Sequence, residues 1–499
     1  MATKLATPGV YVEEKSSFGN TVVSVPTAVP AFIGYTEKAN RGAQSLLNTP
    51  TKISSFAEYC ELFGDSPNTQ FEISSSEDGS SFNIRSVKST KFLMYDSLRF
   101  YFSNGGADCY IVSVGDYSSG ISAKKLNDLK SGGGLAALER YAEPTIVVIP
   151  EAILLSESDC FSLQSAMLQH CGLKMKNRFA VLDVYNGDQK RTFDDADVIT
   201  KFREGVGSNH LSWGAAYYPF LQTSVVSESE VDFTRISNPE TLVDMINAEV
   251  DSNVENQSLT DTKAEAIKEL TAKMIDATNN DITTIQATLN AVSPTFKLIM
   301  TSMLDQLNIM APSSAMAGAY SMVDNSINVG KSPANISLGS VISPMVNINE
   351  ENQEDLNTPL NGKAINAIRS FTGKGTLVWG ARTMDGNSQD WRYISVRRTM
   401  TYLEQSIKSA AEAFVFAPNN STTWSTLKAT VSNFLSNQWS AGLLVGSNSA
   451  DAYEVQIGLG STMTSNDILD GILKMTIKVA VVRPAEFIVL TFEQKQQQS

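Results

Sequence analysis

The sequence has few of the side chains from which metal and redox sites are built. Only 4 of its 499 residues are cysteine and 2 are histidine. The cysteines are Cys60, Cys109, Cys160 and Cys171, and no two of them have the C-x-x-C spacing of zinc or thioredoxin-like motifs. We therefore expect free, buried thiols and no disulfide framework.

His170 directly precedes Cys171, and the pair is the one place where a histidine and a thiol are adjacent. A structural zinc site needs four ligands, and this pair has no partners at a metal-binding spacing. The sequence therefore predicts no metal site and no cofactor.

Long apolar runs are also missing. Runs such as Thr145–Ile149 and Val479–Val482 are far shorter than the ~20 residues that a membrane-spanning helix needs. The N-terminal segment contains Lys4 and Lys15 but lacks the continuous apolar stretch of a secretory signal. We expect no direct membrane insertion, and synthesis and assembly in the cytosol.

Basic residues are in deficit. The 39 Lys and Arg residues against 53 Asp and Glu give a formal net charge of −14. A nucleic-acid-binding surface is normally basic, because it must displace counterions from phosphates, so we expect no nucleic acid partner. With 42% hydrophobic residues the chain has enough apolar material to fold, and its length predicts about two to four domains.

Phosphate-binding and hydrolase motifs are incomplete or absent. Gly330–Ser332 has the last three letters of a phosphate-binding loop, but Asn325 stands where that motif requires a glycine. The glycine-rich segment Thr372–Thr376 leads into a strand-like segment instead of opening a helix, so we expect a turn there. No G-x-S-x-G, H-E-x-x-H or G-x-G-x-x-G motif occurs. These gaps favour a protein that is not an enzyme, although catalytic groups can converge from distant positions.

Short apolar segments predict buried strands in the first half of the chain. Ala28–Tyr35 and Cys109–Val114 are two of them, and the polar segment 65–90 between them is predicted to be a solvent-exposed, loose hairpin. Thr145–Ile149 and Phe179–Val184 flank a helical pattern over 158–171, which predicts a βαβ unit of an α/β domain.

The last third of the chain has the clearest periodicity. Apolar residues at helical spacing run from Val396 to Phe414, and Pro418 ends the pattern. A second helix is predicted over 424–435, and both helices are expected to flank a sheet. Apolar and polar residues alternate in Leu473–Val481, which predicts a half-buried strand.

Several segments resemble contractile tail sheath proteins of phages and phage-like particles. Pro8–Glu14 and Val25–Gly34 resemble the opening of those proteins, and Phe102–Gly106, Gly214–Pro219 and Ala311–Ser314 are similar to sheath segments in the same order.

The C-terminal third carries the most specific part of this resemblance. The segments are Ile365–Arg369, Val378–Thr383, Gly460–Thr464 and Arg483–Ile488. Their combination looks most like the sheaths of extracellular contractile injection systems, a phage-derived class that carries toxins instead of a genome.

The resemblance implies a multidomain α/β fold with a C-terminal α/β assembly domain, an inserted α/β middle domain and extended strand arms at both ends. The expected division is an N-terminal arm (1–24), the N-terminal part of the core with an exposed insertion at 65–90 (25–130), a middle domain with a helical stretch at 225–300 (131–345), the assembly domain (346–482) and a C-terminal arm and tail (483–499). The serine-glycine segment Ser131–Gly134 is expected to be a linker.

The resemblance also implies a mechanical function, in which subunits lend their arms to sheets in neighbouring subunits. Donated strands satisfy unpaired strand edges. The residues expected to exchange are Val10, Tyr11, Val12, Phe487, Ile488, Val489 and Leu490. Because donor and acceptor differ, the contact does not close within a pair and propagates as a helical polymer, expected as stacked hexameric rings of identical subunits.

Further partners follow from the same resemblance. We expect an inner tube protein, with Asp355, Lys363 and Arg369 as candidate contacts, and baseplate and tail-terminator or cap proteins. The metastable sheath would contract and drive the tube through a target envelope without nucleotide hydrolysis. Assembly is expected in the bacterial cytoplasm, followed by residence in a phage tail-like particle, released or anchored.

Two alternatives remain at this point. A sheath of a genome-delivering phage tail would be encoded beside capsid and portal genes instead of toxin cargo. A soluble α/β enzyme that uses the region 145–220 would stay monomeric and contain a ligand-filled pocket.

Overall fold

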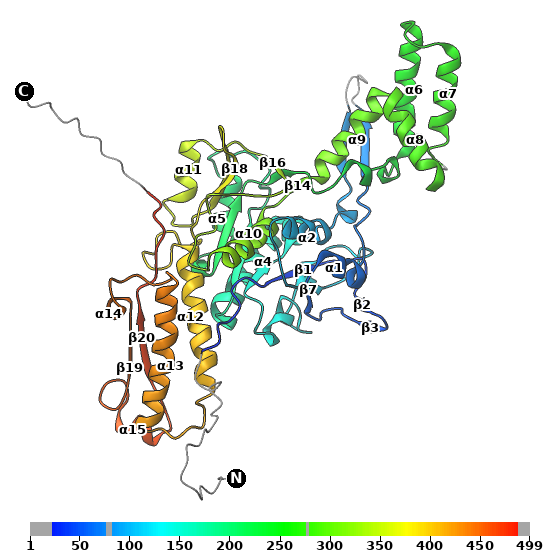
Figure 1. The fold of residues 1–499 in the computed structure, drawn as a ribbon. Helices are drawn as coiled ribbons and strands as arrows, with labels where there is room; N and C mark the ends of the chain where they lie inside the picture. Colours follow the sequence, from blue (N-terminus) through cyan, green and yellow to red (C-terminus); the bar gives the residue numbers. More distant parts are fainter. Residues whose placement is uncertain (1–21, 76–81, 276–278, 488–499) are drawn as a thin grey trace, which may run out of the picture. The chain divides into compact units, whose positions relative to one another are not determined.

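The computed structural model describes residues 22–75, 82–275 and 279–487 (Figure 1). They form two compact units. The larger one, here called the core unit, contains residues 26–398 and 483–487, and the smaller one, here called the small unit, contains residues 22–25 and 399–482. Each unit is therefore built from two separate stretches of the chain.

A nine-stranded sheet forms the centre of the core unit (Figure 1). In spatial order its strands are β15 (Ile336–Ser337), β18 (Gly375–Trp379), β17 (Asn366–Phe371), β12 (Gly214–Tyr218), β11 (Phe179–Asp183), β10 (Ile146–Val148), β1 (Pro30–Gly34), β7 (Cys109–Ser113) and β4 (Thr51–Ile53). The strands from β17 to β7 pair in parallel. The outer strands β18, β15 and β4 join by antiparallel pairing.

The central strands are buried on both faces, which explains why they appear in the sequence as continuous apolar runs. Successive side chains of a strand point to opposite faces. In β11, Ala180 and Leu182 belong to one hydrophobic cluster, whereas Phe179 and Val181 belong to another. The core unit therefore has one apolar layer on each side of the sheet.

Helices cover both layers. On one side lie α4 (Glu157–Gln169), α5 (Val198–Gly205) and α11 (Glu350–Asn357), and on the other side lie α1 (Phe56–Phe63), α2 (Met94–Ser103) and α10 (Ser313–Ser326). The contact between α10 and α2 is close, because a Cβ on Gly318 would lie 2.5 Å from the carbonyl oxygen of Tyr101. The arrangement is a doubly wound α/β fold.

Shorter elements complete the core unit. They are β2 (Asn40–Arg41), β3 (Gln44–Ser45), α3 (Ala123–Leu126), β8 (Asn127–Asp128), β9 (Gly133–Gly134), β13 (Leu221–Thr223), β14 (Ile309–Met310) and β16 (Val341–Pro344). The last three form a small sheet in the order β14-β13-β16.

Several local predictions are confirmed. The predicted βαβ unit is β10, α4 and β11, with Ile146 opposite Phe179 in the parallel pair. The two buried strands predicted before it are β1 and β7, which are also neighbours. The glycine-rich segment forms the turn between β17 and β18, where Gly373 has a φ of +77° that favours glycine.

The polar segment 65–90 forms the predicted hairpin, of β5 (Phe71–Ser75) and β6 (Phe82–Ser86). The prediction that it is solvent-exposed is wrong for one face, because Phe71, Ile73 and Ile84 are buried. Their cover comes from the predicted helical stretch, which forms four helices packed with the hairpin in one hydrophobic cluster. These are α6 (Pro239–Glu255), α7 (Asp261–Ala272), α8 (Asn279–Val292) and α9 (Pro294–Leu307).

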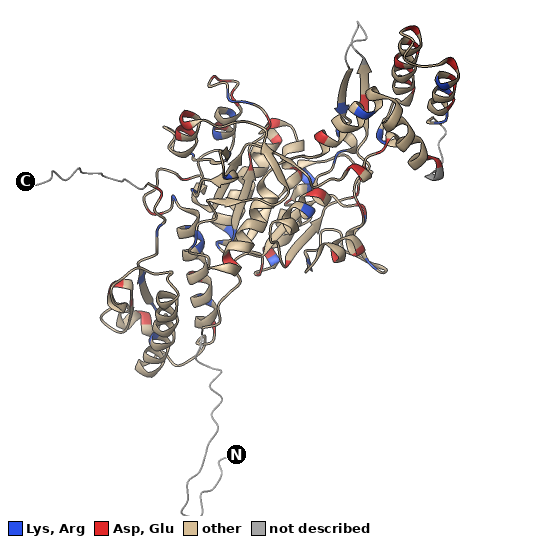
Figure 2. Ribbon diagram, turned by 45° about the horizontal axis from the view of Figure 1, so that its top comes forward, with Lys and Arg blue, Asp and Glu red and all other residues tan. Residues whose placement is uncertain are grey.

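The helical region 225–307 carries much of the negative charge (Figure 2). Its sequence has 14 acidic and 5 basic residues, whereas the whole chain has a net charge of −14. The remainder of the chain is consequently much closer to neutral.

The small unit contains the two predicted C-terminal helices and the predicted strand. α12 (Ile394–Glu412) enters it from residue 399, and α13 (Ser421–Ser440) begins after Asn420, whose side chain accepts hydrogen bonds from the N–H groups of Thr422 and Thr423 at 3.1 Å. The sheet consists of β19 (Tyr453–Ile457) and β20 (Met475–Val479), with the short helices α14 (Ser449–Ala452) and α15 (Ser465–Leu469) beside it in the sequence.

The compact units differ from the predicted division of the chain. The predicted boundaries at 131 and 346 fall within the nine-stranded sheet, which takes β1, β12 and β17 from three different predicted segments. Ser131–Gly134, predicted as a linker, instead closes the β8–β9 hairpin, and both glycines of β9 are buried. Pairing between distant strands creates this unit, and local composition does not encode it.

The cysteines are free thiols, and Cys109, Cys160 and Cys171 are buried. His170 is also buried, with Nε2 2.9 Å from the guanidinium of Arg178. Burial, together with this cation, lowers the pKa of His170 to about 3.

Within the described ranges there is no cluster of three potential metal ligands and no helix with the length and apolar character needed to cross a bilayer.

The strand order reverses at β1, which has β7 on one side and β10 on the other. In doubly wound sheets such a reversal opens a crevice at the carboxyl ends of the strands. Here the buried carboxyl group of Glu151 occupies that position. Its Oε1 accepts hydrogen bonds from the N–H groups of Met94 at 3.0 Å and of Leu93 and Tyr35 at 3.4 Å. Gly34 makes room for it, because a Cβ there would lie 2.2 Å from Oε2.

Glu151 should make the stability of the core unit pH-dependent. Burial raises the pKa of this carboxyl from 4.5 to about 7, so the folded chain binds a proton that the unfolded chain has lost between those values. The free energy of unfolding therefore falls as pH rises through this window, by about 3 kcal/mol at most. We expect Glu151→Gln to remove this part of the pH dependence in denaturant titrations of the unassembled chain.

Glu240→Gln, at an exposed helical position, is the matched control and should leave the pH profile as it is. A Glu151→Gln chain with the same loss of stability toward neutral pH as the unsubstituted chain would contradict this assignment.

Candidate assembly surfaces

The small unit contains a sheet with only two strands. β19 and β20 pair antiparallel from Tyr453 opposite Val479 to Ile457 opposite Met475. In the part of the chain that the structure describes, neither strand has a second neighbour along this length. Beyond β20, Val445 donates its N–H to the carbonyl of Ala480 at 2.7 Å. The two outer edges of the β19–β20 sheet therefore present backbone groups that another strand can pair with.

The inner face of this sheet is incompletely covered. Val455 of β19 is buried in the cluster formed with α12 and α13, whereas Met475, Ile477 and Val479 of β20 are only half-buried. Two-stranded sheets are marginally stable in water, and a third strand normally supplies the missing cover. The edge of β20 is thus the position at which an added strand would gain most.

One end of the small unit exposes large apolar side chains. Phe416, in the loop between α12 and α13, is fully exposed and has a positive φ of 67°. Val415 beside it and Leu469 are 60% and 83% exposed. The two loops are tied together, because Asn419 donates its side-chain N–H to the carbonyl of Ile472 at 3.2 Å. Such a patch is typical of a contact surface.

The N-terminal exchange residues Val10, Tyr11 and Val12 lie outside the described residues. The described chain begins with Val22, which is buried in the core of the small unit. Val25 then donates its N–H to the side chain of Ser406 at 3.2 Å. The segment that follows the N-terminal arm is therefore fixed on α12.

Of the C-terminal exchange residues, Phe487 is described and is 71% exposed, while Ile488, Val489 and Leu490 lie outside the described residues. The residue just before Phe487 is anchored. Glu486 pairs with Arg382 through Nη2 at 2.7 Å and Nε at 3.0 Å, and it accepts further hydrogen bonds from Asn357 and Tyr393. The Arg382 side chain is only 4% exposed and that of Glu486 18%.

This anchor determines where the C-terminal arm leaves the core unit. Burial of Glu486 would raise the pKa of its carboxyl, but the hydrogen bonds and charge of Arg382 outweigh it, and the pKa is lower than usual. The pair joins two segments of the sheath resemblance, Val378–Thr383 and Arg483–Ile488. A charged residue within each short apolar motif was a signal in the sequence, but the pairing of the two residues could not be predicted from it.

A second cation marks the place where α12 leaves the core unit. Arg398 pairs with Asp324 of α10 at 2.6 Å, and the same guanidinium donates to the carbonyl of Thr27 at 3.0 Å. Both partners of the pair are buried, with side chains 5% and 2% exposed. The points at which the chain passes out of the core unit are thus held by buried charges.

Two of the residues predicted to contact an inner tube are engaged within the core unit. Asp355 of α11 accepts hydrogen bonds from Arg191 at 2.8 Å and Arg203 at 2.9 Å. Burial would raise the pKa of Asp355, but the two guanidinium groups overcome that effect and lower it. The ammonium group of Lys363 donates a hydrogen bond to the backbone carbonyl of Arg203. The guanidinium Nε of Arg203 donates to the backbone carbonyl of Lys363 at 3.0 Å. Their contacts within the chain are therefore structural.

Arg369, the third predicted tube contact, has a side chain 11% exposed and pairs with Glu350 at 3.2 Å. Its guanidinium also lies over the ring of Phe371. The outward-facing groups of α11 are instead acidic, namely Glu350, Glu351 and Glu354, which are all exposed. Of these, Glu350 already pairs with Arg369, and all three are exposed on the surface of α11.

The C-terminal part of the chain, residues 387–495, matches the family described as phage tail sheath C-terminal domain. The matched range includes the β19–β20 sheet, the helices α12 and α13, and Glu486. No curated protein matches the chain.

Solved structures match almost the whole chain. An extracellular contractile injection system sheath complex in its contracted state (PVC) is 27% identical, with a TM-score of 0.61 and coverage of 99% of both chains. The helical sheath of the anti-feeding prophage in its contracted state is 26% identical, with a TM-score of 0.61 and coverage of 98% of this chain and 99% of that one. A chain of the six-fold symmetrised baseplate of the same prophage is 26% identical, with a TM-score of 0.60 and coverage of 98% of this chain and 99% of that one. The resemblance inferred from the sequence is confirmed.

Removing the charge of Glu486 should loosen the anchor of the C-terminal arm. In Glu486→Gln the buried guanidinium of Arg382 keeps its neighbours but loses its counter-ion, which costs about 2–4 kcal/mol. We expect the free energy of unfolding of the core unit, measured by denaturant titration of the unassembled chain, to fall by this amount.

The matched control is Arg483→Gln in the same segment. Arg483 pairs with Asp390 at 3.4 Å, and both side chains are more than half exposed, at 53% and 78%. Exposed pairs contribute at most about 1 kcal/mol. Equal losses in the two variants would show that Glu486 is not a special anchor.

Proposed function

We propose that this chain, whose C-terminal part is a phage tail sheath C-terminal domain and whose fold is that of contractile injection-system sheaths, is the sheath subunit of a phage tail-like contractile particle. The observation that carries the proposal is the match to a contracted-state sheath chain over 99% of both chains at 27% identity. With 99% of this chain covered, the match includes both units and the helical region.

Polymerisation follows from the two-stranded sheet. A strand from a neighbouring copy that adds to the edge of β20 pairs its backbone groups and covers the half-buried Ile477 and Val479. The donors are the predicted arm segments Val10–Val12 and Phe487–Leu490. Donor and acceptor are different surfaces of the same chain, so each subunit passes the contact on and a helical assembly of stacked rings results.

Contraction needs subunits that move as solid bodies while their connections persist. Buried charge pairs, Arg382 with Glu486 and Arg398 with Asp324, hold the chain where it leaves the core unit. Each arm can then reorient beyond a fixed point without the core unit unfolding. The work comes from repacking between subunits, so the protein is not an enzyme and needs no bound nucleotide.

The remaining partners are those of a contractile particle. We place an inner tube protein against α11, whose exposed acidic residues adjoin Asp355, Lys363 and Arg369, and baseplate and cap proteins at the ends of stacked hexameric rings. The particle assembles in the bacterial cytoplasm and is then released or anchored. The exposed Phe416 and Leu469 supply further contact area between copies.

Deleting either arm should abolish assembly without unfolding the subunit. We expect the full chain, expressed alone, to form long striated tubules in negative-stain electron microscopy. Chains without residues 1–20 or without residues 488–499 should give dispersed particles, because the β19–β20 sheet then receives no strand.

A chain without residues 495–499, a polar stretch rich in glutamine, is the matched control and should still form tubules. Circular dichroism must show native helix content in every variant. Tubules from both arm deletions, or single particles from the full chain at several salt concentrations, would count against strand exchange.

A further inference from the structure

A pocket of about 500 Å³ lies in the core unit, outside the carboxyl ends of β10 and β11. Pro150, which follows β10, and Asp183, the last residue of β11, line it, together with the first turn of α10. The pocket is next to the reversal of strand order at β1, the part of a doubly wound sheet where small ligands bind. Glu151 fills the reversal itself, and the pocket opens beside it.

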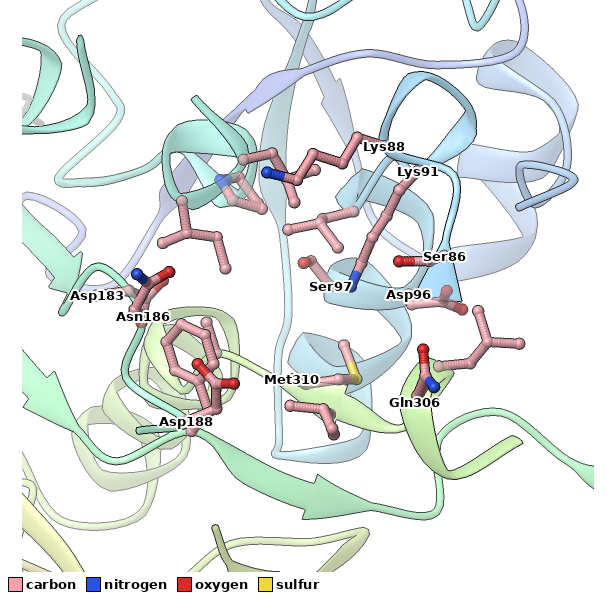
Figure 3. A pocket seen from close by; sticks show the side chains of 18 of the residues that line it. Ser86, Lys88, Lys91, Asp96, Ser97, Asp183, Asn186, Asp188, Gln306 and Met310 are labelled. Carbon is pink, nitrogen blue, oxygen red and sulfur yellow. The ribbon is translucent and has the colours of Figure 1, made fainter. Parts of the chain in front are cut away.

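Two lysines enter the pocket from one wall, and Asp188 and Asn186 face them from the opposite side (Figure 3). Lys88 is exposed at the rim, whereas Lys91 is mostly buried. In the described part of the chain the ammonium group of Lys91 has no hydrogen bond or ion pair. A desolvated cation is costly unless an anion or a hydrogen-bond acceptor lies beside it, so Lys91 is the group of this pocket best suited to hold an anion.

The carboxylates of the pocket do not neutralise Lys91. Asp183 is fully committed, because its two oxygens accept hydrogen bonds from the N–H of Ser313 at 2.8 Å and from its hydroxyl at 2.5 Å. Asp96 lies beside Arg99, at 3.5 Å, and Asp188 is exposed to solvent. Burial lowers the pKa of Lys91, and Asp188 only partly opposes this effect. The positive charge of Lys91 is therefore only partly balanced by carboxylates of the pocket.

The same pocket offers neutral hydrogen-bond donors near Lys91. The hydroxyl groups of Ser86, Ser97 and Ser314 line it, and Ser314 belongs to the first turn of α10. The N-terminus of a helix carries a partial positive charge that favours anions. In α10 the N–H and the hydroxyl of Ser313 already donate to Asp183, so an oxyanion with several acceptor oxygens can use the lysines and the hydroxyls, including that of Ser314 in the first turn of α10.

The rest of the lining is apolar and defines a second part of the ligand. Ile153, Leu154 and Leu155 form one side, and Phe220 and Met310 contribute another. A bare phosphate ion would fill a small fraction of 500 Å³. The space beyond the anion site accommodates an organic body of ring size.

We propose that this pocket binds a small phosphate monoester, with the phosphate on Lys91, Lys88 and the first turn of α10 and the organic part against the apolar wall. The site is independent of the sheath function, since its residues do not belong to the arms or to the β19–β20 sheet.

The first test measures amine reactivity in the full, unsubstituted chain. Acetic anhydride labelling, followed by mass spectrometry of the peptide that contains Lys91, is performed with and without phenyl phosphate. Bound phosphate should slow labelling of Lys91 by at least about fivefold at saturation, because a paired, protonated amine is a poor nucleophile. Labelling of the exposed Lys130 in the same digest should not change. Unchanged labelling of Lys91 at millimolar phenyl phosphate would overturn the proposal.

Equilibrium dialysis of phenyl phosphate with single-residue variants tests which side chains bind the phosphate. Lys91→Met should weaken phenyl phosphate binding by about tenfold or more, the usual loss for a charge-assisted hydrogen bond. Asp188→Asn should tighten binding, since it removes a negative charge facing the phosphate, and a general loss of structure cannot produce that result. Lys130→Met is the matched control.

Comparison of ligands tests the two parts of the site. Inorganic phosphate should bind more weakly than phenyl phosphate, and phenol should not protect Lys91. Equal protection by phenol would reassign the pocket to apolar compounds and overturn the phosphate site. Equal affinity of the Lys91→Met and unsubstituted chains for phenyl phosphate would also overturn the phosphate site.

Discussion

The central constraint on this protein is the hydrogen-bonding demand of a sheet that has only two strands. Peptide groups at a strand edge must find partners, and a two-stranded sheet leaves the outer groups of both strands open. In the small unit this requirement coincides with half-buried apolar residues on β20. A chain with such an edge and a β-prone segment near each end is incomplete as a monomer. We therefore propose that association between copies completes this sheet.

The core unit, in contrast to the small unit, has a sheet that is covered by its own chain. Its nine-stranded sheet has helices on both faces, and even the crevice at the strand reversal is occupied by the chain's own Glu151. Buried ion pairs at Glu486 and Asp324 fix the points where the chain leaves it. Such a unit transmits force without rearranging. The combination of a rigid core unit and an incomplete small sheet suits a sheath subunit, whose connections must survive a large change in packing between subunits.

Local elements could be predicted from the sequence because their signals are local. The helices α12 and α13, the strand β20 and the βαβ unit around α4 each have a complete periodic pattern and a terminating residue such as Pro418. Long-range features could not be predicted. The sheet that joins strands from three predicted domains, the cover over Phe71 and Ile73, and the Arg382–Glu486 pair all depend on contacts between distant segments. For the candidate sites, residue type indicated charged contacts at Asp355 and Lys363, but the structure was needed to see that Arg203 binds both.

The most direct test of the account is the number of strands beside β20 in the assembled state. A helical reconstruction of tubules by cryo-electron microscopy, at a resolution that traces the backbone, would measure it. Strand exchange predicts a sheet enlarged by strands from neighbouring copies, with residues 10–12 of one copy and residues 487–490 of another paired with β19 or β20. A sheet that remains two-stranded within intact tubules would contradict strand exchange as the basis of assembly.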